Sequence, residues 1–451
     1  MTSGGRYNLD RPVLTEIPVA SVCPAFQSET WIDIALLASA LFLQRFAFGK
    51  SAITFNMVAA GLIIAHQFAS GRLLVQYDRL LWFLALGLAV TSSLLLNFDS
   101  RMLYSYSVFL AMYSLFTFSR PSTPDLYKST LRGFQCLILI LSSLGIVQFA
   151  AQFVIDGRQI ILFFRLVPEF LLARDAQLGS NTIIPITQGS SLIKSNGVFL
   201  AEPSTMSQIA ALGILIEVLE FRRPRYLFLL ALGLLMSYSG TGITMLLVVL
   251  PLTALVDSRA QVPALLVAFF ALTLIETGLI DLSAFTSRVD EFENTQASGF
   301  ARFISSFWMT GEYLHIASPL ALLCGNGPAT MKYFNPHGFY LASGGTWFKV
   351  LYEYGLIGAF TFTCFLVSCF QRSRCPKPLI LALFYDYLFT GDALLSMPLL
   401  TIMGVLCTLS GSQPRHVGID EASHHRSSLV PGSSSKSRPS PRDRTYVVGC
   451  D

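Results

Sequence analysis

Long apolar runs follow one another along most of this 451-residue chain. A helix that crosses a bilayer needs roughly 20 mostly apolar residues, because the hydrocarbon core is about 30 Å thick. Such runs predict about twelve spans, at residues 31–48, 51–69, 79–97, 101–119, 132–154, 200–219, 226–238, 241–256, 263–283, 346–370, 377–391 and 394–410. The sequence therefore predicts an all-α fold, a polytopic transmembrane helical bundle over residues 31–410.

The composition favours lipid as the solvent around this bundle. Hydrophobic residues make up 53% of the chain and charged residues 13%, about half the charged share of an average soluble domain. A single soluble core could not bury so much apolar surface, whereas helices in a bilayer expose it to lipid. The net charge of +4 comes from scattered basic residues, which argues against a nucleic-acid partner. The eight cysteines contain no CxxC pair, so no metal site, disulfide framework or cofactor follows from them.

Lysine and arginine predict the orientation, since cytoplasmic connections of membrane proteins carry an excess of both. If the N-terminal segment 1–30 is cytoplasmic, every second connection is cytoplasmic too, and these connections hold most of the cations, including Arg222, Arg223 and Arg225. The tail 411–451 is also cytoplasmic in this arrangement, and its Ser, Pro and Arg content is typical of disorder. Two long loops, at about 155–199 and 284–345, then lie on the outer side.

The first outer loop places Arg165 and Arg174 among bulky apolar residues, and Lys194 follows near its end. One interpretation is a helix in the membrane interface, anchored by arginines near lipid phosphates. The other is that these cations bind a diphosphate, because a guanidinium matches phosphate oxygens bidentately. The residues alone leave both interpretations open.

Glu202 stands directly before Pro203 at the start of the span 200–219. A carboxylate there is either a helix-start residue favoured by the helix dipole or a site residue that faces a cavity, as ionisable groups at membrane depth often do. The second outer loop holds Arg302, the turn Gly325–Pro328 and His337. Histidine is the commonest general base near neutral pH, although a lone loop histidine is more often a structural residue.

The order of these landmarks resembles the O-antigen polymerase and ligase superfamily (Wzy/WaaL type). The resemblance covers about residues 195–370, and its elements are Gly197–Ser204, Ser237–Gly242, Arg302, Gly325–Pro328, Asn335–His337 and Gly355–Gly358. In the ligases a His-Asn pair precedes the last of these motifs more closely than His337 precedes Gly355. That departure favours the polymerase branch over the ligases.

The resemblance implies a metal-independent glycosyltransferase, without a cofactor, in a bacterial inner membrane. Its reaction would join undecaprenyl-diphosphate-linked repeat units into exopolysaccharide or O-antigen at the periplasmic face. Arg302, with Arg165, Arg174 and Lys194, would stabilise the diphosphate, and His337 or Glu202 would accept the proton of the attacking hydroxyl. Expected partners are the lipid-linked glycans, the bilayer, a chain-length regulator and export proteins.

Three other functions remain open at this point. A ligase would use the same donor with another acceptor. A transporter or flippase would need charged residues along many spans, where the sequence offers His66, Glu276, Glu353 and Asp386. A sensor or assembly protein of an export complex would use the C-terminal tail for its contacts.

Overall fold

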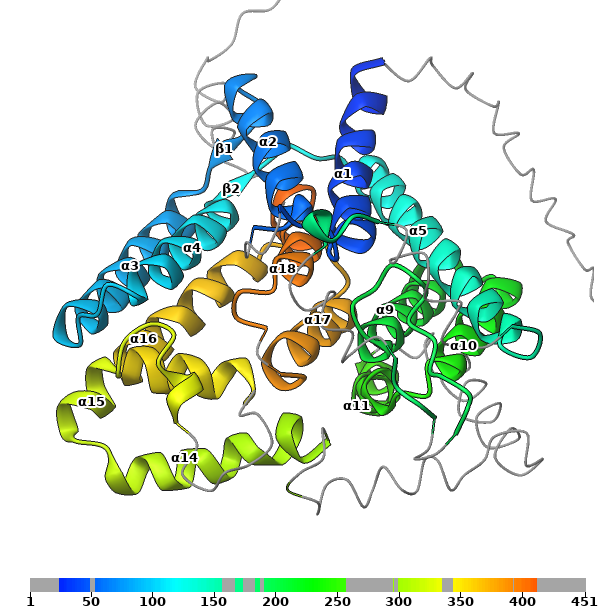
Figure 1. Cartoon of the computed structure of the whole chain (residues 1–451). Coiled ribbons are helices and arrows are strands. Elements are labelled where there is room, and N and C mark those ends of the chain that lie inside the picture. The colour runs from blue at the N-terminus through cyan, green and yellow to red at the C-terminus, as the bar shows by residue number, and fades with distance from the viewer. Residues whose placement is uncertain are drawn as a thin grey trace, which may run out of the picture. The chain divides into compact units, whose positions relative to one another are not determined.

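The computed structural model describes residues 24–48, 53–155, 167–172, 183–186, 190–256, 295, 299–334, 344–391 and 393–411. This part of the chain is 73% helical, with few strands, so the helical fold class is confirmed (Figure 1). Its first half contains α1 (Pro24–Phe42), α2 (Phe55–Ala69), α3 (Tyr77–Leu96), α4 (Met102–Ser114), the 3-10 turn η1 (Leu115–Thr117) and α5 (Pro124–Ala151). Two short antiparallel strands, β1 (Leu74–Val75) and β2 (Phe118–Ser119), were not expected from the sequence.

The second half is helical as well. A short 3-10 turn, η2 (Glu169–Leu171), precedes α9 (Pro203–Ile216), its π-helical end η3 (Glu217–Phe221), α10 (Pro224–Met236) and α11 (Gly240–Val256). The predicted outer loop 284–345 contains a π-helical turn η5 (Phe300–Ile304), α14 (Ser305–Ile316), α15 (Pro319–Cys324) and η6 (Met331–Tyr333). The chain then forms α16 (Thr346–Phe370), α17 (Lys377–Phe389), α18 (Met397–Met403) and η7 (Gly404–Leu409).

Every predicted span coincides with a helix except 263–283, which lies outside the described residues. These helices differ in whether they are long enough to cross a membrane. Among the described residues, α3, α5, α9 with η3, and α16 are the four that are long and apolar enough to cross a membrane. The helix lengths therefore do not confirm the predicted count of about twelve spans, which stays a prediction.

Local capping explains why α5 starts earlier than its apolar run. The hydropathy predicts a span from residue 132, but the helix begins at Pro124. The hydroxyl of Thr123 accepts a hydrogen bond from the backbone N–H of Leu126 at 3.2 Å, and proline suits the first helical position. The cap therefore extends the helix through polar residues that hydropathy assigns to a connection.

Helix α9 is the most buried of the four long helices. It packs against α5, α10, α11 and α17, and α3 packs along α16 elsewhere in the fold (Figure 1). Close approach of α11 to α9 requires glycine at position 242, because a Cβ there would lie 2.5 Å from the backbone carbon of Ser207. The N-terminus of this central helix carries Glu202.

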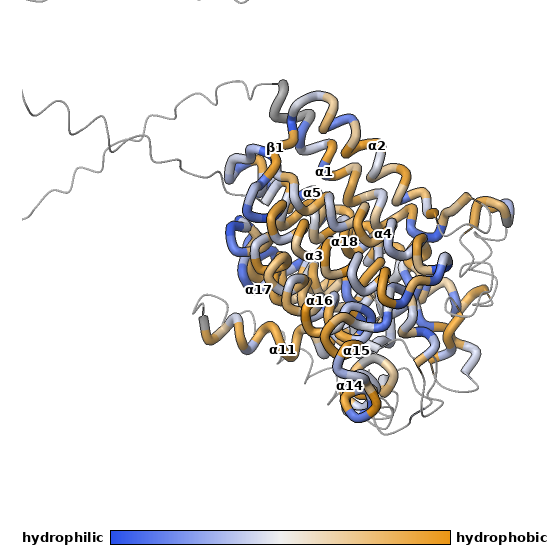
Figure 2. The backbone as a smooth tube through the Cα atoms, turned by 90° about the vertical axis from the view of Figure 1, so that its left-hand side faces the viewer, coloured by the Kyte–Doolittle hydropathy of each residue, from blue (hydrophilic) through white to orange (hydrophobic). Residues whose placement is uncertain are grey.

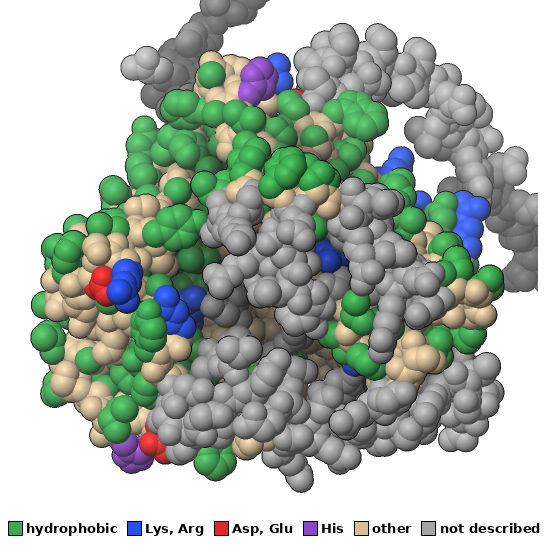
Figure 3. All heavy atoms as spheres, viewed as in Figure 1, with side chains coloured by type: hydrophobic (Ala, Val, Ile, Leu, Met, Phe, Trp, Pro, Cys, Tyr) green, Lys and Arg blue, Asp and Glu red, His purple; other side chains and the backbone are tan. Residues whose placement is uncertain are grey.

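The described surface is strongly apolar. Apolar residues extend along most helices (Figure 2), and hydrophobic side chains cover much of the described part of the visible face, with few charged groups among them (Figure 3). On α3 alone, Leu81, Leu88 and Leu95 are 66–72% exposed. Monomeric soluble proteins rarely expose apolar patches of this extent. The helices are thus compatible with a membrane protein.

Candidate functional site

A cavity of about 450 Å³ lies between α1, α9, α17 and α18. Its polar lining residues are Gln44, Glu202, Ser204, Thr205, Gln208, Asp386, Thr390 and Ser396. Its other lining residues are Ala40, Leu41, Ala201, Ile209, Gly391, Ala393, Pro398, Leu399 and Ile402. Large cavities with an apolar wall and a few convergent polar groups are the usual ligand sites of proteins.

Glu202 faces this cavity from the N-terminus of α9. It occupies the N-cap position with an extended backbone (φ −138°), but its side chain makes no capping hydrogen bond to the helix. Instead, the Ser204 hydroxyl donates to Glu202 Oε2 at 2.7 Å. The two interpretations of Glu202 from the sequence therefore apply together, since the residue starts the helix and its carboxylate lines the cavity.

Asp386 supplies a second carboxylate to the same cavity. It lies near the C-terminal end of α17, is 4% exposed, and accepts a hydrogen bond from the Thr390 hydroxyl at 2.9 Å on Oδ1. The sequence showed it as one of few charges inside an apolar run, without indicating which residues it would meet. The structure brings it to the same cavity as Glu202.

The loop before Glu202 is held by one side chain of α5. Gln148 Oε1 accepts hydrogen bonds from the Ser195 hydroxyl at 2.9 Å and from the backbone N–H of Asn196 at 3.2 Å and of Val198 at 3.3 Å. Gln148 Nε2 donates to Asn196 Oδ1 at 3.0 Å. Because Gln148, Ser195 and Asn196 are buried and bonded to one another, the chain entering α9 has a defined path, which positions Glu202.

The element that carries Arg302 contacts α17 through one pair of aromatic rings. The ring of Phe303, in η5, lies 6.4 Å from the ring of Tyr385, the residue before Asp386. Arg302 itself belongs to η5, although its side chain lies outside the described residues. The helix turn bearing this predicted phosphate ligand is therefore next to α17 at Tyr385, which is not itself a lining residue of the cavity.

His337, Arg165 and Arg174 lie outside the described residues. The segment that contains His337 rejoins the described chain at Gly344, and the backbone N–H of Gly345 donates to Ser306 Oγ at 2.5 Å. The next residue, Thr346, receives a hydrogen bond from the backbone N–H of the cavity-lining Ala393 at 3.1 Å. The described residues Gly345 and Thr346 thus contact Ser306 and the cavity-lining Ala393.

Lys194 is buried, and its backbone N–H donates to the carbonyl oxygen of Ile184 at 2.9 Å. It is not among the described residues that line the cavity. Its assignment to a diphosphate stays a prediction.

The Gly325–Gly327 turn does not line the cavity and instead packs against α16. Gly325 has φ +83° and packs against the kink of α16, where Gly355 has φ +67°. The Asn326 amide donates to the Tyr313 hydroxyl and to the carbonyl oxygen of Tyr352, both at 3.1 Å. Burial raises the pKa of Tyr313, which the bond from Asn326 partly offsets, so this hydroxyl stays neutral. Two separate motifs of the resemblance therefore form one contact.

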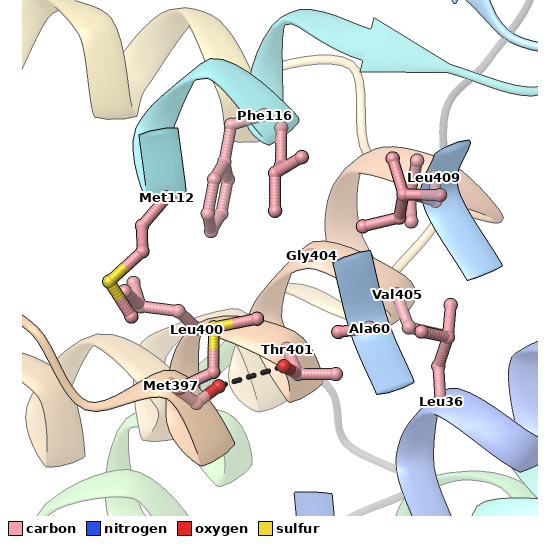
Figure 4. Close-up of a pocket in the computed structure, with 12 residues that line it drawn as sticks. Leu36, Ala60, Met112, Phe116, Met397, Leu400, Thr401, Gly404, Val405 and Leu409 are labelled. Atoms are coloured by element: carbon pink, nitrogen blue, oxygen red, sulfur yellow. Dashed lines mark hydrogen bonds between the residues drawn. The ribbon is translucent and has the colours of Figure 1, made fainter. Parts of the chain in front are cut away.

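The described residues offer no metal site, and a second cavity among them offers no ligand site. Among the described residues, no three His, Cys, Asp or Glu side chains gather as a metal ion requires. A second cavity, of about 20 Å³, lies between α1, α2, α4 and α18 (Figure 4). Its lining is apolar apart from the Thr401 hydroxyl, which donates to the carbonyl oxygen of Met397 at 2.8 Å. This space is too small for a substrate and is lined almost entirely by apolar groups.

No protein-family model matches the chain, and no curated protein and no solved structure matches it.

Proposed function

We propose that this chain is a membrane glycosyltransferase that polymerises undecaprenyl-diphosphate-linked oligosaccharides at the outer face of a bacterial inner membrane. The observation that carries the proposal is the cavity that both Glu202 and Asp386 line, at the buried start of α9. The proposal includes about twelve spans, two outer loops and cytoplasmic termini. It takes its substrate class from the motif order that resembles polymerases of the Wzy/WaaL type.

The lining of the cavity suits a substrate that is half sugar and half lipid. Gln44, Thr205 and Gln208 offer hydrogen bonds to sugar hydroxyls, while Leu41 and Leu399 offer an apolar wall. A polyprenyl chain needs apolar contact, and each buried sugar hydroxyl needs a partner. The mixed lining meets both needs.

Glu202 is the proposed proton acceptor. A hydroxyl of one lipid-linked unit attacks the anomeric carbon of another, a carbon–oxygen bond to the lipid diphosphate breaks, and the hydroxyl proton passes to the carboxylate. The hydrogen bond from the Ser204 hydroxyl orients Glu202 Oε2. Asp386, on α17, binds a sugar hydroxyl. Arg302 stabilises the charge that develops on the diphosphate, with Arg165, Arg174 and Lys194 as further candidates. His337 is the alternative proton acceptor.

The test deletes the gene in its host and measures the undecaprenyl-linked sugars. We expect single repeat units to accumulate while long polymer disappears. Complementation with Glu202→Gln should leave polymer formation reduced by about 10²-fold or more, the usual contribution of a general base. The matched control is Glu220→Gln, which changes an exposed glutamate in η3 on the same helix and should restore polymer fully.

Three outcomes would change the proposal. Long polymer that stays on undecaprenol without being handed on identifies a ligase. An unchanged lipid-linked pool rejects glycosyl transfer altogether and favours transport. Full activity of Glu202→Gln keeps the reaction but removes Glu202 as the base, and His337→Ala then tests the alternative.

A further inference from the structure

Arginine and aromatic side chains interleave where α9 ends and α10 begins. This basic–aromatic cluster consists of residues from α5, η3, α10 and the connection between them: Arg132, Phe221, Arg222, Arg223, Arg225 and Tyr226. It is separate from the cavity described above, whose lining includes none of these residues.

Arg223 holds the cluster together and is already neutralised. Its Nη2 lies 2.5 Å from Oε1 of Glu217, and its backbone N–H donates to Oε2 of the same carboxylate at 3.2 Å. The guanidinium lies 4.7 Å from the ring of Phe221 and 4.4 Å from that of Tyr226. A guanidinium packed against two rings and one buried carboxylate is a rigid centre, around which the other arginines are placed.

The other three arginines are exposed. Arg225 lies 4.7 Å from the Tyr226 ring, and Arg132 lies 5.9 Å from the Phe221 ring. Arg222 ends the π-helix in a left-handed conformation (φ 55°). Within the part of the chain that the structure describes, none of these three makes an ion pair. One exposed carboxylate, that of Glu220, stands on the same turn, so the exposed part of the cluster remains cationic.

We propose that the basic–aromatic cluster binds the phosphate of an anionic phospholipid headgroup. Guanidinium groups form bidentate bonds to phosphate oxygens, and basic residues at the end of a membrane helix attract anionic lipids. Aromatic rings held at the same level are typical of the interface between headgroups and acyl chains. On α10, Phe228 is 57% exposed one turn beyond Arg225, where an acyl chain attached to that phosphate would run. The inference requires a bilayer around these helices and is independent of glycosyl transfer.

The test uses the full chain in detergent and native mass spectrometry with two lipids of identical acyl chains, phosphatidylglycerol and phosphatidylcholine. The wild-type protein should retain phosphatidylglycerol at least about tenfold more tightly, since each arginine near an anionic surface strengthens binding several-fold. Arg222→Gln with Arg225→Gln should remove most of this preference and leave phosphatidylcholine binding unchanged. The matched control removes the same charge from exposed cations elsewhere in the chain, Arg101→Gln with Lys377→Gln, and should keep the preference.

Three results would overturn the inference. They are equal affinity of the wild-type protein for both lipids, an equal loss in the control, and displacement of phosphatidylglycerol by millimolar inorganic phosphate, which would indicate a free-anion site. Melting without added lipid checks that the double variant folds. If it does not fold, Arg132→Gln on the stable helix α5 replaces it, with a smaller expected loss of the same preference.

Discussion

Replacing Gly325 with alanine tests the contact that joins two of the sequence motifs. Gly325 has φ +83° and ψ −179°, a backbone conformation that is essentially reserved for glycine. A Cβ there would press on the carbonyl oxygen of Glu353 and lie 2.5 Å from the backbone nitrogen of Tyr354. Both are main-chain atoms of α16, so no side-chain rotation relieves the clash.

The magnitude follows from the backbone strain and the bonds that must separate. The conformation alone costs about 1–3 kcal/mol for a residue with a Cβ. Moving the turn away from α16 also breaks the bonds from Asn326 N–H to the Tyr352 carbonyl and from Gly327 N–H to the Glu353 carbonyl, both 3.0 Å, at about 1 kcal/mol each. The expected loss is therefore about 3–5 kcal/mol.

The assay is thermal melting of the full chain in detergent, followed by intrinsic fluorescence. Because about 1 kcal/mol moves the midpoint by about 2–4 °C in a domain of some 200 residues, Gly325→Ala should melt several degrees lower. The control is Gly311→Ala in α14, where a Cβ would meet no atom within 4 Å and alanine favours the helix. Equal melting of Gly325→Ala and wild type, or equal shifts in both variants, would refute the reasoning.

Three further substitutions probe other contacts. Asp33→Ala should reduce the free energy of unfolding by about 3–5 kcal/mol and lower the melting temperature, because it leaves the buried Arg120 without the carboxylate that lies 2.6 Å from its Nη2. Asp33→Asn should reduce the free energy of unfolding less. Gln148→Leu should reduce polymer formation in cells more than it reduces the melting temperature, since it releases the loop that positions the cavity carboxylate. Tyr385→Phe should cost about 1 kcal/mol, measured by melting, through the 3.0 Å bond to Thr244 that joins α17 to α11.

Helix positions were predictable from hydropathy because each apolar run is a local signal. The run 346–370 has the same limits as α16. Boundaries moved where capping rather than hydropathy decides them, as at Thr123 before α5. Helices α14 and α15 were not predicted, because they are short, mixed in polarity and stabilised by contacts such as the bond from the Tyr313 hydroxyl to the carbonyl oxygen of Ala321.

The candidate site was predictable only in part. Glu202 was identified from its place before a proline at a span start, which is local information. Asp386 was noticed as a charge in an apolar run, but its proximity to Glu202 depends on the packing of α17 and α18 against α1 and α9. Lining residues from Ala40 to Ile402 come together there, and no spacing along a single element encodes that arrangement.

In the proposed arrangement of about twelve spans, the cavity also gives a reason for a helix that is too short to cross a bilayer. A 13-residue helix such as α17 rises about 20 Å, against about 30 Å of hydrocarbon. Its end carries Asp386 and Thr390, and α18 begins only at Met397. Irregular backbone at membrane depth is tolerated where it is buried in protein or lines a polar cavity, and Gly391 and Ser396 from this connection line the cavity. In the proposed transmembrane arrangement, the break between the two helices places polar groups of Thr390 and Ser396 on the cavity wall instead of against lipid.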